Sequence, residues 1–420
     1  RNIGEFSSLS SGDSVRLLLP NGEEVLISIT QDKKQVNNTK TWSGIFNSNG
    51  YNYPAVFTFG EKNVFGFIGH PDAEYKVTGL NNTAWLYEVP QEYFEEPSPQ
   101  YSLYKRTNMN KVGIAAVLTA GFFTPVIYAQ AEQKQPTEAI EAMVTEIDLL
   151  GVYTPGLKAH YSDDPISAIQ HKVNVANMIH QMSKTDVNIN LVGTMEVKYD
   201  EEVQKISQEV ALNNITPDTK GYTNKAFKGV EGKRAELGAD MVTLFRTLDI
   251  KNSPDYTKER ITKGDKTYSS ISKQCGRAHL LTKYYHDNSP KYIKRKLYSH
   301  VYTNECKDDT FVHELGHNMG LYHAREQYSG KLPHTDGKSY SGAYGYGVNG
   351  QFETTMAYGH KFGVSKRTYT FSNPDIQCNE QPCGLKDMAN AVKTIRYTAP
   401  LVAKVMNKPQ PQVKEIDIAQ

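Results

Sequence analysis

Three histidines near residue 320 have the spacing of a metal site. They are His313, His317 and His323, at relative positions i, i+4 and i+10 in the stretch FVHELGHNMGLYH. On a helix, positions i and i+4 lie on one face a turn apart, so the first two imidazoles can bind the same ion. Three neutral imidazoles leave the fourth position of a zinc ion open for water, which is typical of a catalytic site. We therefore expect one catalytic Zn²⁺.

Two further residues of this stretch suit the same chemistry. A helix that continued past His317 could not bring His323 to the same ion, and Gly320 can adopt the positive φ that ends a helix. Glu314 cannot reach the metal from the same face, and its carboxylate suits a general base that takes a proton from the attacking water. The alternative is an ordinary helix that carries histidines by chance, although five fixed positions would then have to coincide.

The composition limits the partners that this chain can have. With 420 residues, of which 38% are hydrophobic and 10% aromatic, it is long enough for two or three domains with cores of their own. Its 47 Lys and Arg against 46 Asp and Glu give a formal charge of +1. Because no basic excess remains to neutralise a phosphate backbone, we expect no nucleic-acid partner.

The four cysteines all lie in the last third of the chain. Their even number and the absence of a CxxC pair predict two disulfides and an oxidising compartment, rather than a thiol metal site. We expect the pairs Cys275–Cys306 and Cys378–Cys383. Sequence alone does not set the connectivity, and four buried free thiols are the alternative.

Residues 1–97 have the pattern of a small β-rich domain. The stretch SVRLLLPNGEEVLISIT alternates apolar and polar residues around Pro20-Asn21-Gly22, which is a hairpin signal. AVFTFGEKNVFGFIGH repeats this pattern around Gly60-Glu61-Lys62-Asn63. The acidic, proline-bearing run VPQEYFEEPSPQ predicts the boundary of the domain.

Residues 98–145 are predicted to be a linker that contains a signal-like apolar segment, 109–131. Ala129-Gln130-Ala131 has the small-x-small form that signal peptidases cut. The apolar run is slightly short for a membrane-spanning helix and carries Gly121 and Pro125. We favour a segment buried between domains, or one removed on maturation, and expect no stable membrane association.

A larger domain is predicted for residues 146–408, followed by a tail, 409–420. EIDLLGVY at 146–153 has the composition of a strand, and a helix with proline in its first turn begins at Pro165. A second strand, a helix ending at Gly238 and the strand ADMVTLF follow. Alternating strands and helices predict a mostly parallel, twisted sheet with helices packed against it.

The histidine stretch resembles the signature of a known family. HELGHNMGLYH is similar to HExxHxxGxxH of the metzincin zinc endopeptidases, and TTMAYG, with Met356, resembles their methionine-bearing turn beneath the metal. EIDLLGVYTPG, QCGRAHLL and FSNP resemble the bacterial reprolysin-like branch, which includes the peptidyl-Asp metalloendopeptidases, over roughly residues 146–406. The resemblance implies an α/β (α+β) catalytic domain with a twisted mixed sheet and an active-site helix.

The resemblance also implies roles for residues outside the zinc motif. Tyr358 matches the Met-x-Tyr order of astacin-like and serralysin-like enzymes, whose tyrosine can hydrogen-bond the tetrahedral intermediate. Venom-type reprolysins usually lack it, and a core tyrosine is the alternative. The strand after Cys275, with Gly276, Arg277 and Ala278, matches the edge strand on which metzincins bind extended peptides by strand addition.

In metzincins the chain after the methionine turn forms one wall of the pocket for the residue on the carboxyl side of the cut. Here that chain is HKFGVSKRTYTF, with Lys361, Lys366 and Arg367 close together. A cation facing the pocket would favour an acidic substrate side chain, because a buried carboxylate is costly unless it is paired. The alternative is that these are solvated surface charges.

The N-terminal region resembles the propeptides of this bacterial branch in GDSVRLLLPNGE, TWSGIF and VFGFIG. Since it contains no cysteine, a thiolate cannot block the zinc, and His70 and Asp72 are the candidates for that role. An accessory β-domain that stays attached is the alternative. We therefore expect a secreted or periplasmic zinc endopeptidase that acts on proteins or peptides and is made as a zymogen, with its own N-terminal domain as intramolecular inhibitor. The competing hypothesis is a zinc-containing binding or adhesive module without turnover.

Overall fold

The computed structural model describes residues 3–35, 37–80, 83–89, 143–199, 205–219, 222, 225–263, 266–283, 289–330, 332, 340–364 and 366–406. The signal-like segment 109–131, most of the predicted linker and the tail 409–420 lie outside the described residues. Within the described ranges, the structure contains no helix whose length and apolar character would let it cross a membrane.

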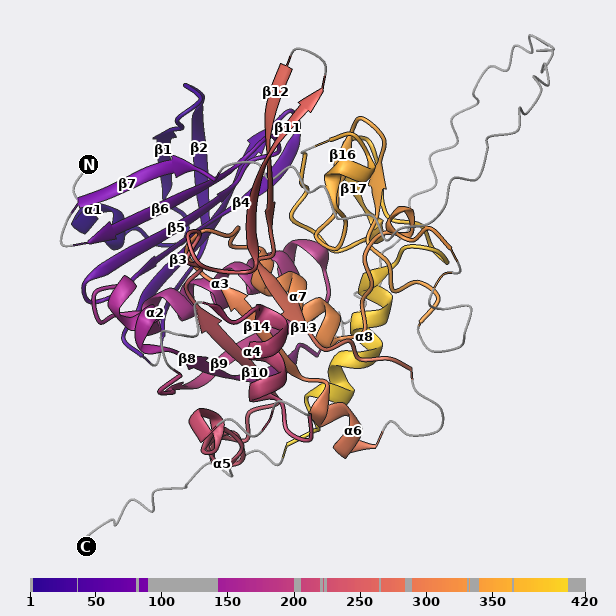
Figure 1. Ribbon diagram of the computed structural model, residues 1–420. Helices are drawn as coiled ribbons and strands as arrows, with labels where there is room; N and C mark the ends of the chain where they lie inside the picture. Colours follow the sequence, from indigo (N-terminus) through magenta and orange to yellow (C-terminus); the bar gives the residue numbers. More distant parts are fainter. Residues whose placement is uncertain are drawn as a thin grey trace, which may run out of the picture.

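The N-terminal domain is β-rich, as expected, and forms an antiparallel meander in which each strand pairs with the next (Figure 1). Both expected hairpin turns are present: Gly22 has a φ of 87°, and the Gly60 N–H donates to the Asn63 carbonyl. The elements described for this domain are α1 (Ile3–Ser8), β1 (Ser14–Leu18), β2 (Glu24–Lys34), β3 (Lys40–Ser48), β4 (Tyr51–Phe59), β5 (Asn63–Gly69), β6 (Glu74–Leu80) and β7 (Thr83–Glu88).

The two faces of this sheet bury different neighbours. Trp42 and Phe57 stack with ring centroids 4.4 Å apart in a core that belongs to the N-terminal domain itself. Val56 and Phe65 belong instead to the large core of the second domain. Val56 and Phe57 separate in this way because successive side chains of a strand point to opposite faces.

The second domain is built on a five-stranded mixed sheet with the order β13-β14-β10-β8-β9. Four strands run parallel, and β13 pairs antiparallel with β14 at the edge of the sheet. The strands are β8 (Thr145–Tyr153), β9 (Val187–Glu196), β10 (Met241–Arg246), β13 (Gly276–Ala278) and β14 (Tyr298–Tyr302). The mixed sheet confirms the α/β class expected for this domain.

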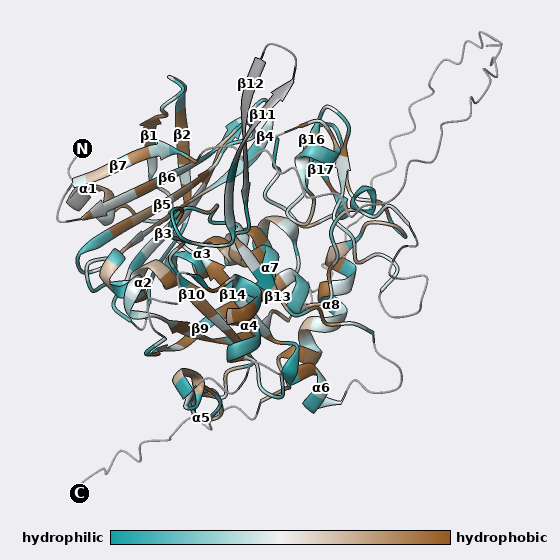
Figure 2. Cartoon of the chain, viewed as in Figure 1, coloured by the Kyte–Doolittle hydropathy of each residue, from teal (hydrophilic) through white to brown (hydrophobic). Residues whose placement is uncertain are grey.

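Helices cover both faces of this central sheet. Leu149 and Leu150 are neighbours on β8, but the first packs into the core with α3, α7 and α8, and the second into the core with α4 and α5. In Figure 2, apolar (brown) stretches of the ribbon lie where these strands and helices meet. The helices are α2 (Pro155–His160), α3 (Pro165–Ser183), α4 (Gln208–Ile215), α5 (Val230–Leu237), α6 (Pro290–Arg295), α7 (Thr310–Asn318) and α8 (Ala391–Val402).

Helix α3 lies between the central sheet and the N-terminal sheet (Figure 1). It begins where the Asp164 side chain accepts from the Ser167 N–H, with Pro165 at the first helical position, and it ends at Lys184 in the left-handed conformation. Most of its side chains are buried, including Lys172, because sheets pack against it from two sides. The two domains are therefore in contact through α3.

The remaining strands in the described part of the chain pair in three two-stranded sheets, β11-β12, β15-β16 and β17-β18. The hairpin β11–β12 extends away from the body of the molecule just before β13 (Figure 1). Disulfides join Cys275 to Cys306 and Cys378 to Cys383, the pairs expected from the sequence. The other strands are β11 (Tyr256–Lys263), β12 (Lys266–Lys273), β15 (Gly347–Val348), β16 (Phe352–Glu353), β17 (Asn373–Cys378) and β18 (Gln381–Cys383).

Candidate metal centre

Helix α7 carries the first two histidines and ends where the third one needs it to end. Gly320 has a φ of 91°, and the Leu321 N–H donates to the Gly316 carbonyl at 2.9 Å, which closes the helix. A Cβ at Gly320 would lie 3.0 Å from the Leu281 carbonyl oxygen, so the backbone also leaves little space for a side chain. The chain then turns back and brings His323 to the helix.

The three imidazoles converge on one point. His323 Nε2 lies 3.1 Å from His313 Nε2 and 3.2 Å from His317 Nε2. Tetrahedral zinc with Zn–N bonds of about 2.05 Å would separate its nitrogen ligands by roughly 3.3 Å. The three ligand atoms lie within 4.8 Å of one another, and this is the metal-ligand group found among the described residues. The donor set therefore fits a zinc ion.

Backbone carbonyls hold two of the rings in the ligand form. His313 Nδ1 donates to the Thr355 carbonyl and His317 Nδ1 donates to the Leu321 carbonyl, each at 2.8 Å. Because Nδ1 carries the proton in both rings, the Nε2 lone pair is available to a metal. Burial lowers the pKa of His313 to about 3 and that of His317 to about 4, so both are neutral at neutral pH.

Tyr358 and Met356 lie beside this group, from the turn after the motif. Tyr358 Oη is 3.2 Å from His323 Nε2, and the Tyr358 ring stacks on His313 with centroids 5.9 Å apart. Met356 is fully buried, and a Cβ at Gly316 of α7 would lie 2.7 Å from its sulfur. The methionine thus supports the helix from below, and the tyrosine hydroxyl faces the ligand atoms.

The Glu314 side chain projects from helix α7 toward the edge strand β13. Its side chain is 5% exposed, and burial raises its pKa to about 8, although Arg277 opposes the shift. A divalent cation at the histidines would lower this pKa again. A Cβ at Gly276 of β13 would lie 2.6 Å from Glu314 Oε1, so the carboxylate occupies the space that a side chain at this glycine would need.

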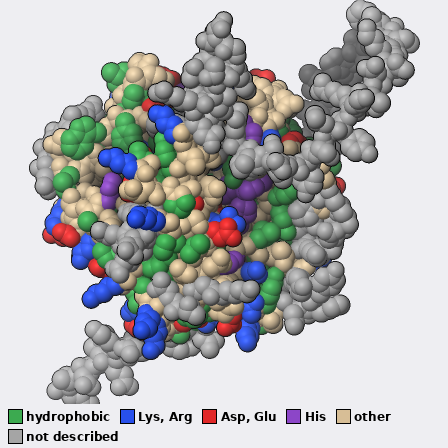
Figure 3. Space-filling view, viewed as in Figure 1, with side chains coloured by type: hydrophobic (Ala, Val, Ile, Leu, Met, Phe, Trp, Pro, Cys, Tyr) green, Lys and Arg blue, Asp and Glu red, His purple; other side chains and the backbone are tan. Residues whose placement is uncertain are grey.

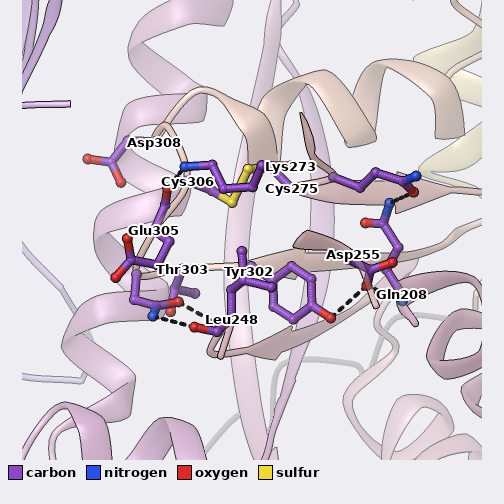
Figure 4. Close-up of a disulfide and its surroundings, with 12 residues drawn as sticks. Gln208, Leu248, Asp255, Lys273, Cys275, Tyr302, Thr303, Glu305, Cys306 and Asp308 are labelled. Atoms are coloured by element: carbon purple, nitrogen blue, oxygen red, sulfur yellow. Dashed lines mark hydrogen bonds between the residues drawn. A yellow bond between two sulfur atoms is a disulfide. The ribbon is translucent and has the colours of Figure 1, made fainter. Parts of the chain in front are cut away.

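A disulfide joins the edge strand to the segment before α7. Figure 4 shows Cys275, just before β13, bonded to Cys306, and the Lys273 ammonium donating to the Glu305 carbonyl. At the base of the β11–β12 hairpin, the Tyr302 hydroxyl donates to Asp255 at 2.8 Å. The strand beside Glu314 is therefore anchored covalently to the segment just before α7.

Arg367 and Lys366 lie in different surroundings from those expected. The Arg367 guanidinium contacts Asp309 Oδ2 at 2.5 Å and Glu353 Oε1 at 3.2 Å, and its side chain is only 12% exposed. It also donates to the Ala357 carbonyl next to Met356. With both carboxylates bound, Arg367 is a structural link between the start of α7 and the methionine turn, which corrects its expected role as a pocket cation. Lys366 is half-exposed, 3.7 Å from Asp72.

The two groups expected to block the metal are engaged elsewhere. His70 is 2% exposed, and its Nε2 lies 3.0 Å from a carboxylate oxygen of Glu23. Asp72 pairs with Lys366, as described above. On the face shown in Figure 3, a group of histidine side chains lies in a hollow at the position of α7 in Figure 1. The contacts described for His70 and Asp72 therefore do not support a blocking role.

The sequence pointed to the three histidines that converge, but not to the groups that orient them. The carbonyls of Thr355 and Leu321 carry no side-chain signal, because any residue could supply them. The pairing of Asp309 with Arg367 spans 58 residues and likewise leaves no local pattern. Asp309, at the N-cap of α7, was the available clue, since carboxylates are favoured at helix N-termini.

Three family profiles match parts of this chain. Residues 166–324 match the Metallo-peptidase family M12B Reprolysin-like, and residues 298–387 match Peptidase M66. Residues 2–93 match the BamI lipocalin-like domain. The first two matches overlap across the histidine motif, and the third covers the N-terminal sheet.

Known proteins show the same similarity. A curated relative, the peptidyl-Asp metalloendopeptidase of Pseudomonas aeruginosa, is 29% identical over 273 residues, which are 63% of this chain but only 41% of that protein. One similar solved structure, of a chaperone-substrate complex, has a TM-score of 0.43 at 17% identity and covers 63% of this chain and 36% of its own. Another, metalloproteinase-II from Bacteroides fragilis, has a TM-score of 0.40 at 10% identity, with 77% and 86% covered. The family profile over residues 166–324 and the identity to the Pseudomonas protein together support a bacterial reprolysin-like metallopeptidase domain in this chain.

Proposed function

We propose that this chain is a zinc-dependent endopeptidase that hydrolyses protein or peptide substrates. The observation that carries the proposal is the convergence of three imidazoles, with His323 Nε2 3.1 Å from His313 Nε2 and 3.2 Å from His317 Nε2. A buried glutamate lies on the same helix, and a tyrosine hydroxyl lies 3.2 Å from His323 Nε2. The match to the M12B metallopeptidases and the name of the Pseudomonas relative support it.

The residues divide the work of hydrolysis. His313, His317 and His323 would hold one zinc ion, which supplies a Lewis acid for the peptide carbonyl and makes water more acidic. Glu314 then accepts the proton of the attacking water and delivers it to the leaving nitrogen. The Tyr358 hydroxyl donates a hydrogen bond to the oxygen of the peptide carbonyl, on which negative charge develops.

The edge strand β13 is the proposed binding site for the substrate backbone. Gly276, Arg277 and Ala278 lie on the edge of the central sheet, and Gly276 lies directly against Glu314. An extended peptide that adds to this edge would pass the carboxylate and the histidines. Main-chain hydrogen bonds would provide affinity there, which suits an endopeptidase that accepts many sequences.

Casein hydrolysis by wild type and by Glu314→Gln tests this function. We expect the wild type to hydrolyse casein, and the variant to retain one equivalent of zinc and lose hydrolysis. Glu326→Gln, an exposed glutamate downstream of the same motif, is the matched control. If the wild type binds one equivalent of zinc but does not hydrolyse casein, the result would favour the alternative, a zinc-containing binding module without turnover.

We also propose that the chain is exported and latent when intact. Two disulfides favour an oxidising compartment, either extracellular or periplasmic. The N-terminal domain remains the proposed intramolecular inhibitor, through steric cover that a cut relieves and not through His70 or Asp72. A cut between about residues 99 and 146 should then raise the specific activity. Equal activity of the intact and the cut chain would remove the zymogen from the proposal.

The most detailed part of the proposal is a preference for an acidic substrate residue directly after the scissile bond. It is supported by the name of the Pseudomonas relative and by Lys366, which is half-exposed and already faces a carboxylate, that of Asp72. Digestion of a mixed peptide library should enrich Asp and Glu after the scissile bond, and Lys366→Ala should reduce this enrichment. Lys393→Ala, at an exposed lysine of α8, serves as the comparison. Cuts scattered before apolar residues would contradict the preference.

A further inference from the structure

A cluster of buried ionisable groups lies where the N-terminal sheet meets the second domain. We call it the Asp308 cluster. Its members are all at most 5% exposed: Glu74 and Lys76 on β6, His171 and Lys172 on α3, and Asp308 just before α7. Charged groups are rarely buried to this extent unless they are paired. The contacts within the cluster therefore show which segments of the chain it holds together.

Asp308 is the centre of these contacts. Its Oδ1 accepts from Lys76 Nζ at 3.0 Å and from the Lys172 ammonium, and its Oδ2 lies 3.4 Å from His171 Nε2. The Asp308 N–H donates to Glu74 Oε1 at 2.7 Å. The lysines hold the pKa of Asp308 well below its usual range. Both its side chain and its backbone are thus held by residues of the N-terminal domain.

The position of Asp308 gives the cluster its importance. It lies two residues after Cys306, whose disulfide fixes the start of β13, and two residues before Thr310, where α7 begins. Lys76 also donates to the Cys306 carbonyl at 2.5 Å. Figure 4 shows Cys306 and Asp308 on this one short segment. The N-terminal domain therefore binds the segment that lies between the disulfide to the edge strand β13 and the start of α7.

Apolar and polar contacts extend the same interface. Phe65 and Phe67 of β5 belong to the core that contains Ile169 and Val173 of α3. The Asn63 side chain donates to the Tyr161 carbonyl at 2.9 Å. These contacts are those of a domain interior, and separation of the two domains would expose both aromatic rings to water.

The N-terminal domain also contacts the segment that follows the methionine turn. The Tyr369 hydroxyl donates to the His70 carbonyl at 3.3 Å, and the Arg367 N–H donates to the Pro71 carbonyl at 3.2 Å. Arg367 is the residue that links Asp309 at the start of α7 to the turn after Met356. The N-terminal domain thus contacts both segments that hold the histidine helix in place.

We propose that the N-terminal domain is a docked partner that positions helix α7, and that it stays bound to the second domain after the linker is cut. Glu74 and Lys76 are positioning residues in this proposal, because they act on the metal centre only through the segment before α7. The docking itself is independent of the proposed function. Its effect on turnover rests on that function.

Gel filtration of a cut chain tests the docking. A site for a highly specific protease is placed between residues 98 and 142 of the full chain, which is then cut and run at 150 mM salt. We expect the two pieces of wild type to elute together. Elution of two separate pieces, with zinc retained by the larger piece, would overturn the proposal. This measurement needs no peptidase activity, so it also stands if the chain does not hydrolyse peptides.

Substitution of Lys76 tests the role of the cluster. Loss of one partner of a buried charge pair typically weakens an interface severely, so Lys76→Met should raise the dissociation constant of the cut pieces by about 30-fold or more. Lys76→Arg, which keeps the charge, should restore docking in large part. Lys62→Met, at an exposed lysine of the same sheet, should change nothing. Equal docking of wild type and Lys76→Met would refute the assignment.

The catalytic arm uses the cut chain, because the intact chain is proposed to be latent. If Lys76 positions α7, Lys76→Met should lower kcat about tenfold with KM within twofold, and Lys76→Arg should recover most of the loss. A variant that merely unfolds would instead lose active protein in proportion, with both constants of the remainder unchanged. Active-site titration with a tight inhibitor separates the two cases, and an unchanged kcat per active site would remove the positioning role.

Discussion

The histidine group and the Asp308 cluster lie near the two ends of the same short stretch of chain, and both bury ionisable side chains. In the cluster the Asp308 carboxylate faces other ionisable groups of the protein, because two lysines and a histidine contact it. At the histidines each oriented ring gives one nitrogen to a backbone carbonyl and turns the other toward a shared point. Mutual pairing indicates structure, whereas convergent lone pairs indicate a ligand.

The difference also appears in the way the two regions respond to burial. A buried pair is stable only while both partners are present, because a lone buried charge costs several kcal/mol. A buried neutral imidazole has no such partner to lose, and burial keeps it neutral and ready to bind a cation. Removal of one residue should therefore destabilise the fold in the first region and abolish chemistry in the second.

The largest expected effect is that of His313→Ala. The two remaining imidazoles should not retain the metal, so zinc should fall from one equivalent to near zero and hydrolysis below detection. Metal analysis after gel filtration and casein hydrolysis are the measurements. His360→Ala, at an exposed histidine nearby, should keep both properties. Full zinc stoichiometry in His313→Ala would contradict the ligand assignment.

Glu314→Gln should keep the metal and lose the chemistry. A glutamine has nearly the same size but cannot accept the proton of water, so kcat should fall by roughly 10²- to 10⁴-fold. Zinc content and the urea midpoint should remain those of wild type. If zinc is lost together with activity, Glu314 is part of the ligand set and the division between ligand and base is wrong.

Asp308→Ala should have the opposite profile, a large loss of stability. It leaves two buried lysines without their carboxylate, and the expected cost is about 3–5 kcal/mol of unfolding free energy. Urea denaturation followed by tryptophan fluorescence measures it. Asp375→Ala, at an exposed aspartate, should change stability by no more than about 0.5 kcal/mol. Equal midpoints for the two variants would show that the cluster contributes nothing.

Gly276→Ala should affect turnover far more than stability. The new Cβ would lie 2.6 Å from Glu314 Oε1, and the flexible glutamate can yield, so the fold tolerates the change while the base moves. A displacement of about 1 Å can cost about 100-fold in rate, and we expect a loss of this size in kcat. Gly232→Ala, with open space around it, is the control. Wild-type kcat in Gly276→Ala would show that the base sits elsewhere.

The smallest expected effect is a change in pH dependence. Burial, with Asp309 and Asp308 nearby, raises the pKa of Glu74 to about 8, although Lys76 and Lys307 oppose the shift. Because the folded pKa lies above the unfolded value of about 4.3, the stabilisation by Glu74 is complete below pH 4 and is lost as the pH rises through 8. Between pH 5 and 8 wild type should therefore lose stability relative to Glu74→Gln. Parallel urea-midpoint profiles for the two proteins would contradict this.

Local sequence determined the parts of this protein that depend on neighbours along the chain. The i, i+4 spacing puts two histidines on one helix face, and a glycine three residues later allows the turn that returns the third. Hairpin turns at Gly22 and Gly60 follow from residues that favour φ above zero or a tight turn. The even number of cysteines within one region likewise predicted the disulfides that the structure contains.

The tertiary structure alone decided which charges are paired and which face a ligand. The charge of Arg367 and its position after the methionine turn suggested a specificity residue. In the structure, two carboxylates from other segments, Asp309 and Glu353, bind it. Lys76 meets Asp308 across 232 positions of sequence, and Gly276 meets Glu314 only because a sheet edge passes over a helix. The physical reason is that spacing along the chain specifies directions on one helix or strand, whereas the energy of a buried charge depends on every element that packs around it.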